Sequence, residues 1–185
     1  MVRCHFDSDG AWLVFQRNLD AKTNFQVGWQ SYKHGFGDPQ GSYWLGNEIV
    51  HKISIKTQQK IKIILKSFDG DVKEWIYAKF HIESESANYT LRAKSRITGG
   101  SDILNDAKGR EFTTLGFDND VSSYINCAEE LNRGGFWYGN CGSFTPNALW
   151  VNASNLNRGD KSGIRYSRWK QNQILKSTEM MIRDP

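Results

Sequence analysis

Two carboxylates separated by a single residue are the clearest candidates for chemistry in this sequence. Asp118 and Asp120 flank Asn119 in a polar stretch. Such a pair can converge on one hard cation, and because calcium takes about 6–8 oxygen ligands, backbone carbonyls and waters would complete its shell. Asp and Asn also favour turns for backbone reasons. The motif on its own therefore leaves a calcium site and an ordinary turn both open.

The three cysteines are an odd number, so at least one thiol has no partner within the chain. Cys127 and Cys141 enclose a segment that contains Gly134 and Gly135. A disulfide that closed this loop would stabilise the fold by ~3 kcal/mol through chain entropy. Two unrelated buried thiols, as in a cytosolic protein, are the alternative. The spacing leaves both interpretations open.

Signatures of known catalytic sites are missing. The four histidines (His5, His34, His51 and His81) show neither an HExxH arrangement nor helical metal spacing. The sequence contains no GxSxG, P-loop or GxGxxG motif. We therefore expect no enzymatic activity.

Two sequons, at Asn88 and Asn152, are candidates for N-glycosylation and favour export. The first residues carry no basic start followed by an apolar core, so they do not form a secretory signal. A cytosolic protein begins in this way, and so does a fragment whose upstream part has been cut off. The compartment stays open at this point.

Composition predicts one folded domain over residues 1–185. The chain is 38% hydrophobic and 13% aromatic, with seven tryptophans, so it has enough bulky surface to fold. A net charge of +4 without an arginine-rich tract argues against a nucleic-acid partner. No segment approaches the ~20 apolar residues that span a bilayer.

The elements that must position these residues are mostly strands. Alternating or β-branched patterns predict strands over residues 11–16, 60–66, 75–82 and 89–93, and the spacing of aromatic residues predicts a short helix over 25–32. Residues 48–57 suit a helix or a strand equally. Lys60, Lys62 and Lys66 form a basic stripe, which we interpret as a solvated strand face rather than a polyanion site. From residue 99 onward turn-forming residues dominate, so we expect this part to need a stabilising cross-link such as a disulfide or a bound metal.

Several motifs in order resemble one family. Residues 36–47 read FGDPQGSYWLGN, close to the F-G-x-x-x-G-E-F-W-L-G-N signature of fibrinogen C-terminal (fibrinogen-related) domains. Residues 12–17 and the closing residues 180–183 also resemble the family's motifs. The resemblance implies an extracellular α+β domain of ficolin, tachylectin, angiopoietin and tenascin type. Its expected fold is a central mixed or antiparallel sheet with short helices and a loop-rich, calcium-binding C-terminal subdomain.

The resemblance assigns roles to individual residues. It implies Ca²⁺ ligation by the carboxylates of Asp118 and Asp120 and by carbonyl oxygens at Ser122 and Tyr124. It also implies that Cys127 and Cys141 form a disulfide. Family domains begin about thirty residues earlier, with a cysteine that pairs with the cysteine at the position of Cys4. Because that partner is missing here, the resemblance implies that Cys4 is unpaired or forms an intermolecular bond, and that the domain is N-terminally truncated.

A ligand pocket is the last implied feature. Its expected residues are Asn140, Cys141, Gly142 and Asp160, with a cis peptide bond between Asn140 and Cys141. Acetyl-recognising members carry a His where this chain has Gly142, and Tyr-Ala where it has Asp160 and Lys161. The usual aromatic wall for an acetyl methyl group is thus missing, which argues against an N-acetyl-sugar lectin.

The resemblance implies a secreted, non-catalytic, calcium-binding recognition module. A lectin-like module for glycans or other surface ligands, plausible in innate immunity, is the first hypothesis. The alternatives are a protein-binding matrix or receptor-ligand module, and a truncated isoform with little function of its own. Expected partners are glycans or extracellular and cell-surface proteins, with oligomerisation only through regions outside the chain. Binding of heparin-like polyanions by the lysine stripe stays open.

Overall fold

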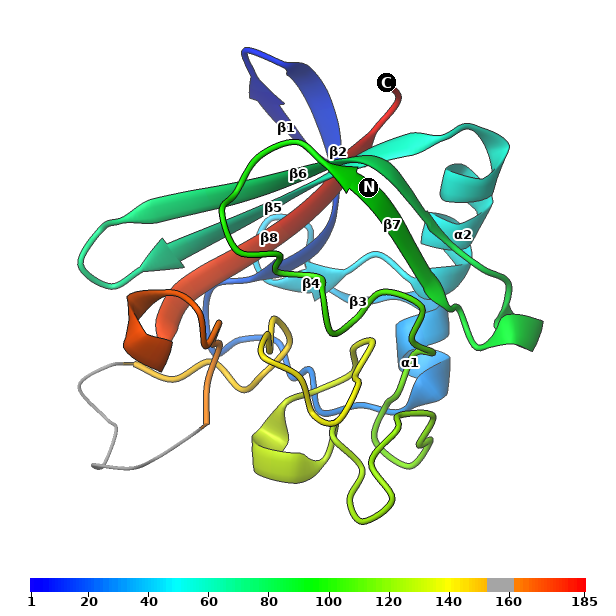
Figure 1. Cartoon of the computed structure of the whole chain (residues 1–185), viewed down its shortest axis with the longest axis vertical. Helices are drawn as coiled ribbons and strands as arrows, with labels where there is room; N and C mark the ends of the chain where they lie inside the picture. Colours follow the sequence, from blue (N-terminus) through cyan, green and yellow to red (C-terminus); the bar gives the residue numbers. More distant parts are fainter. Residues whose placement is uncertain (153–161) are drawn as a thin grey trace.

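The computed structural model describes residues 1–152 and 162–185. Its elements combine one large sheet with a few short helices, as Figure 1 shows. In chain order they are β1 (Arg3–Asp7), β2 (Gly10–Asn18), α1 (Trp29–His34), β3 (Phe36–Gly37), β4 (Tyr43–Trp44), α2 (Asn47–Lys56), β5 (Gln59–Ser67), β6 (Val72–Ile82), the 3-10 turn η1 (Glu85–Ala87), β7 (Leu91–Arg96), the 3-10 turns η2 (Glu130–Asn132) and η4 (Lys170–Asn172), and β8 (Leu175–Arg183).

The sheet joins the two ends of the chain. Its strand order is β3-β4-β2-β8-β5-β6-β7, with β1 added to β2 as a hairpin. The C-terminal strand β8 lies between β2 and β5 and pairs antiparallel with both. The named strands all pair in the antiparallel sense, which confirms the expected α+β class with an antiparallel central sheet.

The predicted strands over 11–16, 60–66 and 75–82 are confirmed as β2, β5 and β6, whereas the last predicted strand starts at Leu91. The helix predicted over 25–32 is displaced toward the C-terminus, because the Asn24 side chain accepts the N–H of Gln26 and holds a turn there. Residues 48–57, which suited a helix or a strand equally, lie mainly in the helix α2, whose buried residues Val50 and Ser54 are one turn apart.

The interpretation of the lysine stripe as a solvated face is wrong at Lys62. This side chain is 3% exposed, and its ammonium contacts carboxylate oxygens of Asp7 at 2.6 Å and Asp9 at 3.0 Å. It also lies 4.7 Å from the centre of the Trp12 ring. The β1–β2 hairpin therefore folds back over β5 and covers the middle of the stripe.

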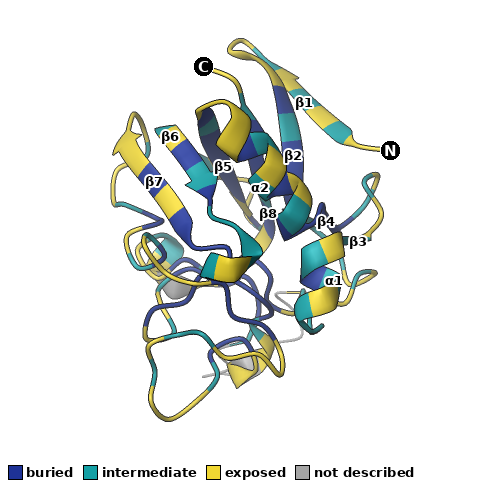
Figure 2. Cartoon of the chain, turned by 90° about the vertical axis from the view of Figure 1, so that its right-hand side faces the viewer, coloured by how far each residue is buried: buried dark blue, intermediate teal, exposed yellow. Residues whose placement is uncertain are grey.

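The loop-rich segment after β7 lies below the sheet, and Figure 2 shows that much of it near the sheet is buried. Trp44 of β4 and Trp137 of the loops both contact Phe112, with ring centres 5.6 and 4.9 Å apart. The buried Gln16 side chain donates to the Asn147 side chain across 131 positions of sequence. One core thus holds the loops in place against the sheet.

Within the described ranges, none of the helices is long and apolar enough to cross a membrane.

Candidate functional site

The disulfide implied by the resemblance is present. Cys127 and Cys141 are joined, with their Cα atoms 4.9 Å apart, and Cys4 is a free, exposed thiol on β1. Cys127 is buried, whereas Cys141 is half-buried. The disulfide connects two loops, one that carries the paired carboxylates and one that carries the expected ligand pocket.

The loop of residues 115–125 contains both predicted carboxylate ligands. Its entrance is a tight turn in which Thr114 and Phe117 exchange backbone hydrogen bonds of 2.9 and 3.1 Å. Gly116 has a φ of 70° in this turn, a conformation that favours glycine. Next, Asn119 donates its side-chain amide to the Phe112 carbonyl at 2.8 Å. These bonds hold the base of the loop against the core.

Asp120 is the centre of the loop's hydrogen bonding. One carboxylate oxygen accepts the Ser122 N–H at 2.7 Å and the other accepts the Cys127 N–H at 2.8 Å. The Asp118 carboxylate accepts the Asp120 N–H at 3.1 Å. Burial raises the pKa of Asp120, and the neighbouring Asp118 carboxylate raises it further. The two acids therefore repel each other when both are ionised.

The donor set of this loop fits a calcium ion. A divalent cation would offset the negative charge of the two neighbouring carboxylates, and calcium prefers oxygen ligands alone. In the described part of the chain, no group of three or more acidic, histidine or cysteine side chains gathers around a metal-sized space. A cation at Asp118 and Asp120 would therefore need backbone carbonyls, and Ser122 and Tyr124 lie in the right segment to supply them.

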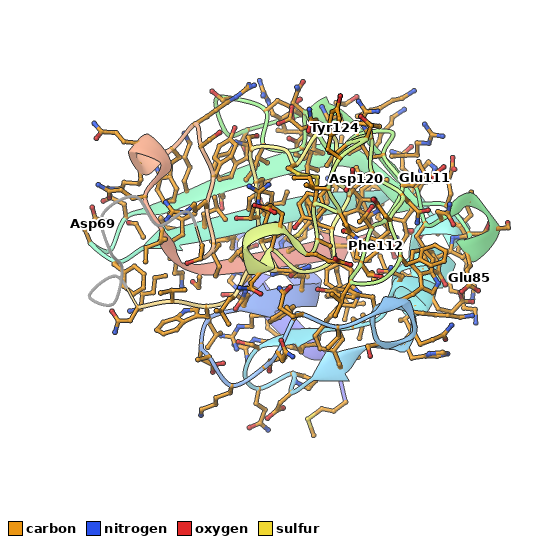
Figure 3. The ribbon with its side chains drawn as sticks, turned by 90° about the horizontal axis from the view of Figure 1, so that it is seen from below. Asp69, Glu85, Glu111, Phe112, Asp120 and Tyr124 are labelled. Atoms are coloured by element: carbon orange, nitrogen blue, oxygen red, sulfur yellow. A yellow bond between two sulfur atoms is a disulfide. The ribbon has the colours of Figure 1, made fainter. Side chains whose placement is uncertain are left out.

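The same loop exposes a row of apolar side chains. Tyr124 is 93% exposed, and Leu115, Phe117, Val121 and Ile125 are exposed as well. Figure 3 shows Tyr124 and Asp120 near each other in the upper part of the view. Sequence reasoning missed these residues as a surface, although apolar residues inside a polar loop were a signal for it. An exposed apolar cluster on a well-tethered loop is typical of an interaction site.

The ligand pocket expected around Cys141 is narrow. The hollow beside Gly142 and Tyr138 has a volume of about 10 Å³, which holds no more than one water molecule. Gly142 lines this hollow, Asn140 is exposed but does not line it, and Asp160 lies outside the described residues. The role of these four residues in ligand binding stays a prediction.

The expected cis peptide before Cys141 is wrong, because no peptide bond in the described ranges is cis. The chain turns instead through the backbone φ angles of Cys141 and Gly142, which are both 56°. A left-handed conformation costs a non-glycine residue roughly 1–2 kcal/mol. The disulfide and the hydrogen bond from Arg133 to the Cys141 carbonyl, at 2.8 Å, hold Cys141 in place.

The first sequon lies next to the 115–125 loop. The Asn88 side-chain amide donates to Glu111 at 2.9 Å and to Asn119 at 3.4 Å, and Asn88 is half-buried. Asn152 is exposed at the end of the described stretch, and the rest of its sequon lies outside the described residues. Glycosylation at either site stays a prediction.

Comparison with known proteins agrees with this geometry. All of residues 1–185 match the family described as fibrinogen beta and gamma chains, C-terminal globular domain. The chain belongs to this family. The fibrinogen C-terminal domain described here is 37% identical to angiopoietin-1 of Rattus norvegicus over 98% of its own length, and 35% identical to angiopoietin-2 of Homo sapiens over 94%. The domain spans about a third of these curated relatives, 37% and 35% of their lengths.

Solved structures show the same fold. The fibrinogen-like globe domain of human ANGPTL2 matches this fibrinogen C-terminal domain with a TM-score of 0.92 and 32% identity, covering 99% of this chain and 85% of that one. Lamprey fibrin D-dimer, complexed with the peptide ligand Gly-His-Arg-Pro-amide, matches with a TM-score of 0.86 and 26% identity, covering 100% and 66%.

Proposed function

We propose that this domain is a non-catalytic extracellular recognition module that binds a protein partner through the 115–125 loop. The exposed apolar side chains of that loop are the observation that carries the proposal. Tyrosine is enriched at the energetic centres of protein interfaces, and an apolar surface of this kind suits a protein better than a hydroxyl-rich glycan. Kinship with the fibrinogen-like domains of angiopoietins supports the same class of module.

The extracellular placement has support of its own. A disulfide between Cys127 and Cys141 persists in an oxidising compartment and is rare in the cytosol. The angiopoietin relatives are secreted proteins, which supports the same placement. We therefore treat the partner as a cell-surface or matrix protein.

Calcium completes the proposal as a structural ion. Bound by Asp118 and Asp120, it would neutralise two carboxylates that repel each other and hold the backbone on either side of Val121 in one conformation. Ordering the loop before binding lowers the entropy that association must offset. The ion would act on binding through loop order rather than through direct contact with the partner.

The proposal is tested with the biotinylated, disulfide-intact chain on cultured cells in calcium-containing buffer. We expect saturable binding that trypsin treatment of the cells removes, and that the double variant Val121→Ser/Tyr124→Ser weakens at least tenfold. The control Val72→Ser/Ile97→Ser removes two exposed apolar groups that lie outside the loop and is expected to bind like the native chain.

Two results would contradict it. Binding that survives trypsin but is lost after glycosidase treatment identifies a glycan partner and restores the lectin hypothesis. Equal binding by the loop variant and the native chain removes the loop from the contact surface, whatever the partner is.

A further inference from the structure

A second hollow is lined by none of the residues of the 115–125 loop. It has a volume of about 310 Å³ and forms where the end of β2, the β5–β6 turn and the start of β8 meet. Figure 3 shows Asp69, in that turn, at the left edge of the molecule and away from Asp120 and Tyr124. The volume is at the lower limit of ligand pockets, so it suits a small molecule or one unit of a larger one.

A β-bulge shapes this pocket. Lys66 of β5 pairs with Ser177 of β8, but the next pair is Ser67 with Leu175, so Lys176 is an extra residue on β8. In a regular strand Lys176 and Ser177 would point to opposite faces. The bulge allows both to line the same pocket, and bulges commonly redirect side chains in this way.

The lining has an excess of positive charge. Arg17 is paired, since its Nε donates to Glu179 at 3.2 Å and its Nη1 donates to the Gln40 carbonyl at 3.1 Å. That pair neutralises the Glu179 carboxylate, which also lines the pocket. Lys66 and Lys176 have no acidic partner in the described ranges, so two ammonium charges remain for a ligand.

One hydroxyl adds a donor to these charges. Ser177 lines the pocket and is 7% exposed as a whole residue. A serine hydroxyl can donate a hydrogen bond to an anion that lies between the two lysines.

The opposite wall is apolar. Leu19 and Phe68 line the pocket, and the Phe68 ring packs against Trp150 with ring centres 6.1 Å apart. This backing keeps the Phe68 ring in place as a flat surface. A ligand that combines an anionic group with a C–H-rich ring matches both walls.

We propose that this pocket binds an acidic sugar unit, with its sulfate or carboxylate group between Lys66 and Lys176 and its ring against Phe68. Lysine ammonium groups bind such oxyanions as point charges. The choice of a sugar acid rests on the extracellular placement proposed above, because polysaccharides rich in sulfate and carboxylate groups are extracellular. Of its two lysines, Lys66 belongs to the basic stripe of Lys60, Lys62 and Lys66 that the sequence showed, whereas Lys176 does not.

Titration calorimetry with two probes tests the proposal. The first is a heparin tetrasaccharide, which carries sulfates, and the second is a tetragalacturonate, which carries carboxylates alone. We expect at least one to bind at low ionic strength and to weaken as salt is added. Preference for the first assigns a sulfate ligand, and preference for the second assigns a carboxylate.

Variants that remove the same number of positive charges at two places distinguish binding in the pocket from general electrostatic attraction. We expect Lys66→Gln/Lys176→Gln to raise the Kd at least tenfold, and the single variant Lys66→Gln to raise it about threefold if the double variant does not fold. The control Lys79→Gln/Lys94→Gln removes the same charge from a directly opposed, exposed pair on β6 and β7 and should change the Kd less than twofold.

Equal weakening in both double variants, or no binding of either probe, overturns the proposal. The loop variant Val121→Ser/Tyr124→Ser keeps the pocket and should bind the tetrasaccharide like the native chain. Loss of partner binding with intact sugar binding, or the reverse, therefore shows which of the two sites fails.

Discussion

The carboxylate of Asp120 accepts the backbone N–H of Cys127 at 2.8 Å, so one side chain connects the acidic loop to the disulfide. The same carboxylate accepts the Ser122 N–H at 2.7 Å. Anything that changes the charge at Asp120 therefore acts on the backbone at Ser122 and Cys127, on either side of the exposed Tyr124 and Ile125. This link is the physical basis for expecting calcium, the disulfide and partner binding to depend on one another.

Calcium is expected to stabilise the domain through Asp118. At a concentration 100 times its Kd, a ligand that binds only the folded state adds about 2.7 kcal/mol, or roughly 5–10 °C in Tm for a chain of this size. The variant Asp118→Asn should lose this gain in calorimetric scans with calcium and with chelator. Its control is Asp38→Asn, because exposed Asp38 likewise accepts the N–H two residues ahead, at 2.9 Å. A calcium shift that persists in Asp118→Asn contradicts the site.

Removal of the disulfide is expected to cost about 3 kcal/mol, the chain-entropy value for a loop of this length. Urea unfolding of Cys127→Ser/Cys141→Ser measures this loss. The control is Cys4→Ser, which changes an exposed free thiol and is expected to alter the free energy of unfolding by no more than about 0.5 kcal/mol. We also expect the double variant to bind calcium more weakly, because Cys127 positions one end of the Asp120 contact. Unchanged calcium affinity would show that the loop is ordered without the disulfide.

Lys62 is expected to matter more for stability than an exposed lysine in a comparable ion pair. Lys62→Met retains the packing on Trp12 but leaves Asp7 and Asp9 without their cation, and we expect a loss of about 1–3 kcal/mol. Lys33→Met breaks a more exposed pair with Glu85, also at 2.6 Å, and should cost no more than about 1 kcal/mol. Urea unfolding at neutral pH compares them. Equal losses would contradict the importance of burial.

The same cluster predicts a dependence of stability on pH. Burial opposes ionisation of Asp7, but hydrogen bonds from Lys62, the Asp9 backbone and Trp12 outweigh it and lower the pKa from its ordinary 3.8. The contribution of Asp7 to stability is therefore present above pH 3.8 and is lost as the pH falls through the lowered folded-state pKa. Unfolding free energies between pH 6 and pH 2 should fall more for the native chain than for Asp7→Asn. Parallel curves would contradict this assignment.

Gly99 is expected to tolerate a side chain poorly. A Cβ there would lie 2.0 Å from Cδ1 of the buried Trp75 ring, and φ is +106°. Gly99→Ala combines backbone strain with overpacking and should cost at least about 2 kcal/mol more than Gly70→Ala. Gly70 has a similar φ of +95° but nothing within 4 Å of its Cβ, so thermal unfolding of the pair isolates the steric part. Equal losses would mean that the Trp75 ring moves aside.

Local patterns predicted much of the framework. The alternation in β5 and the aromatic run in β2 gave the strands because the period of a strand is a property of neighbouring residues. At α2 local patterning was ambiguous, since Ile49 suited a helix and Ile55 suited a strand, and both are exposed in the helix. Burial of Val50 against the rest of the fold decides for the helix there, and that information is absent from the segment itself.

The sequence by itself determined the family, the strands β2, β5 and β6, and the positions of the paired carboxylates and the two bridged cysteines, because these depend on residue type and spacing along the chain. Only the tertiary structure decided which charges are buried and which apolar residues are exposed. Lys62 meets Asp7 across 55 positions, and a bulge between β5 and β8 brings Lys176 beside Lys66. Burial and electrostatic environment arise from such long-range pairings, so no local pattern could separate Lys62 in the core from Lys66 in an open pocket.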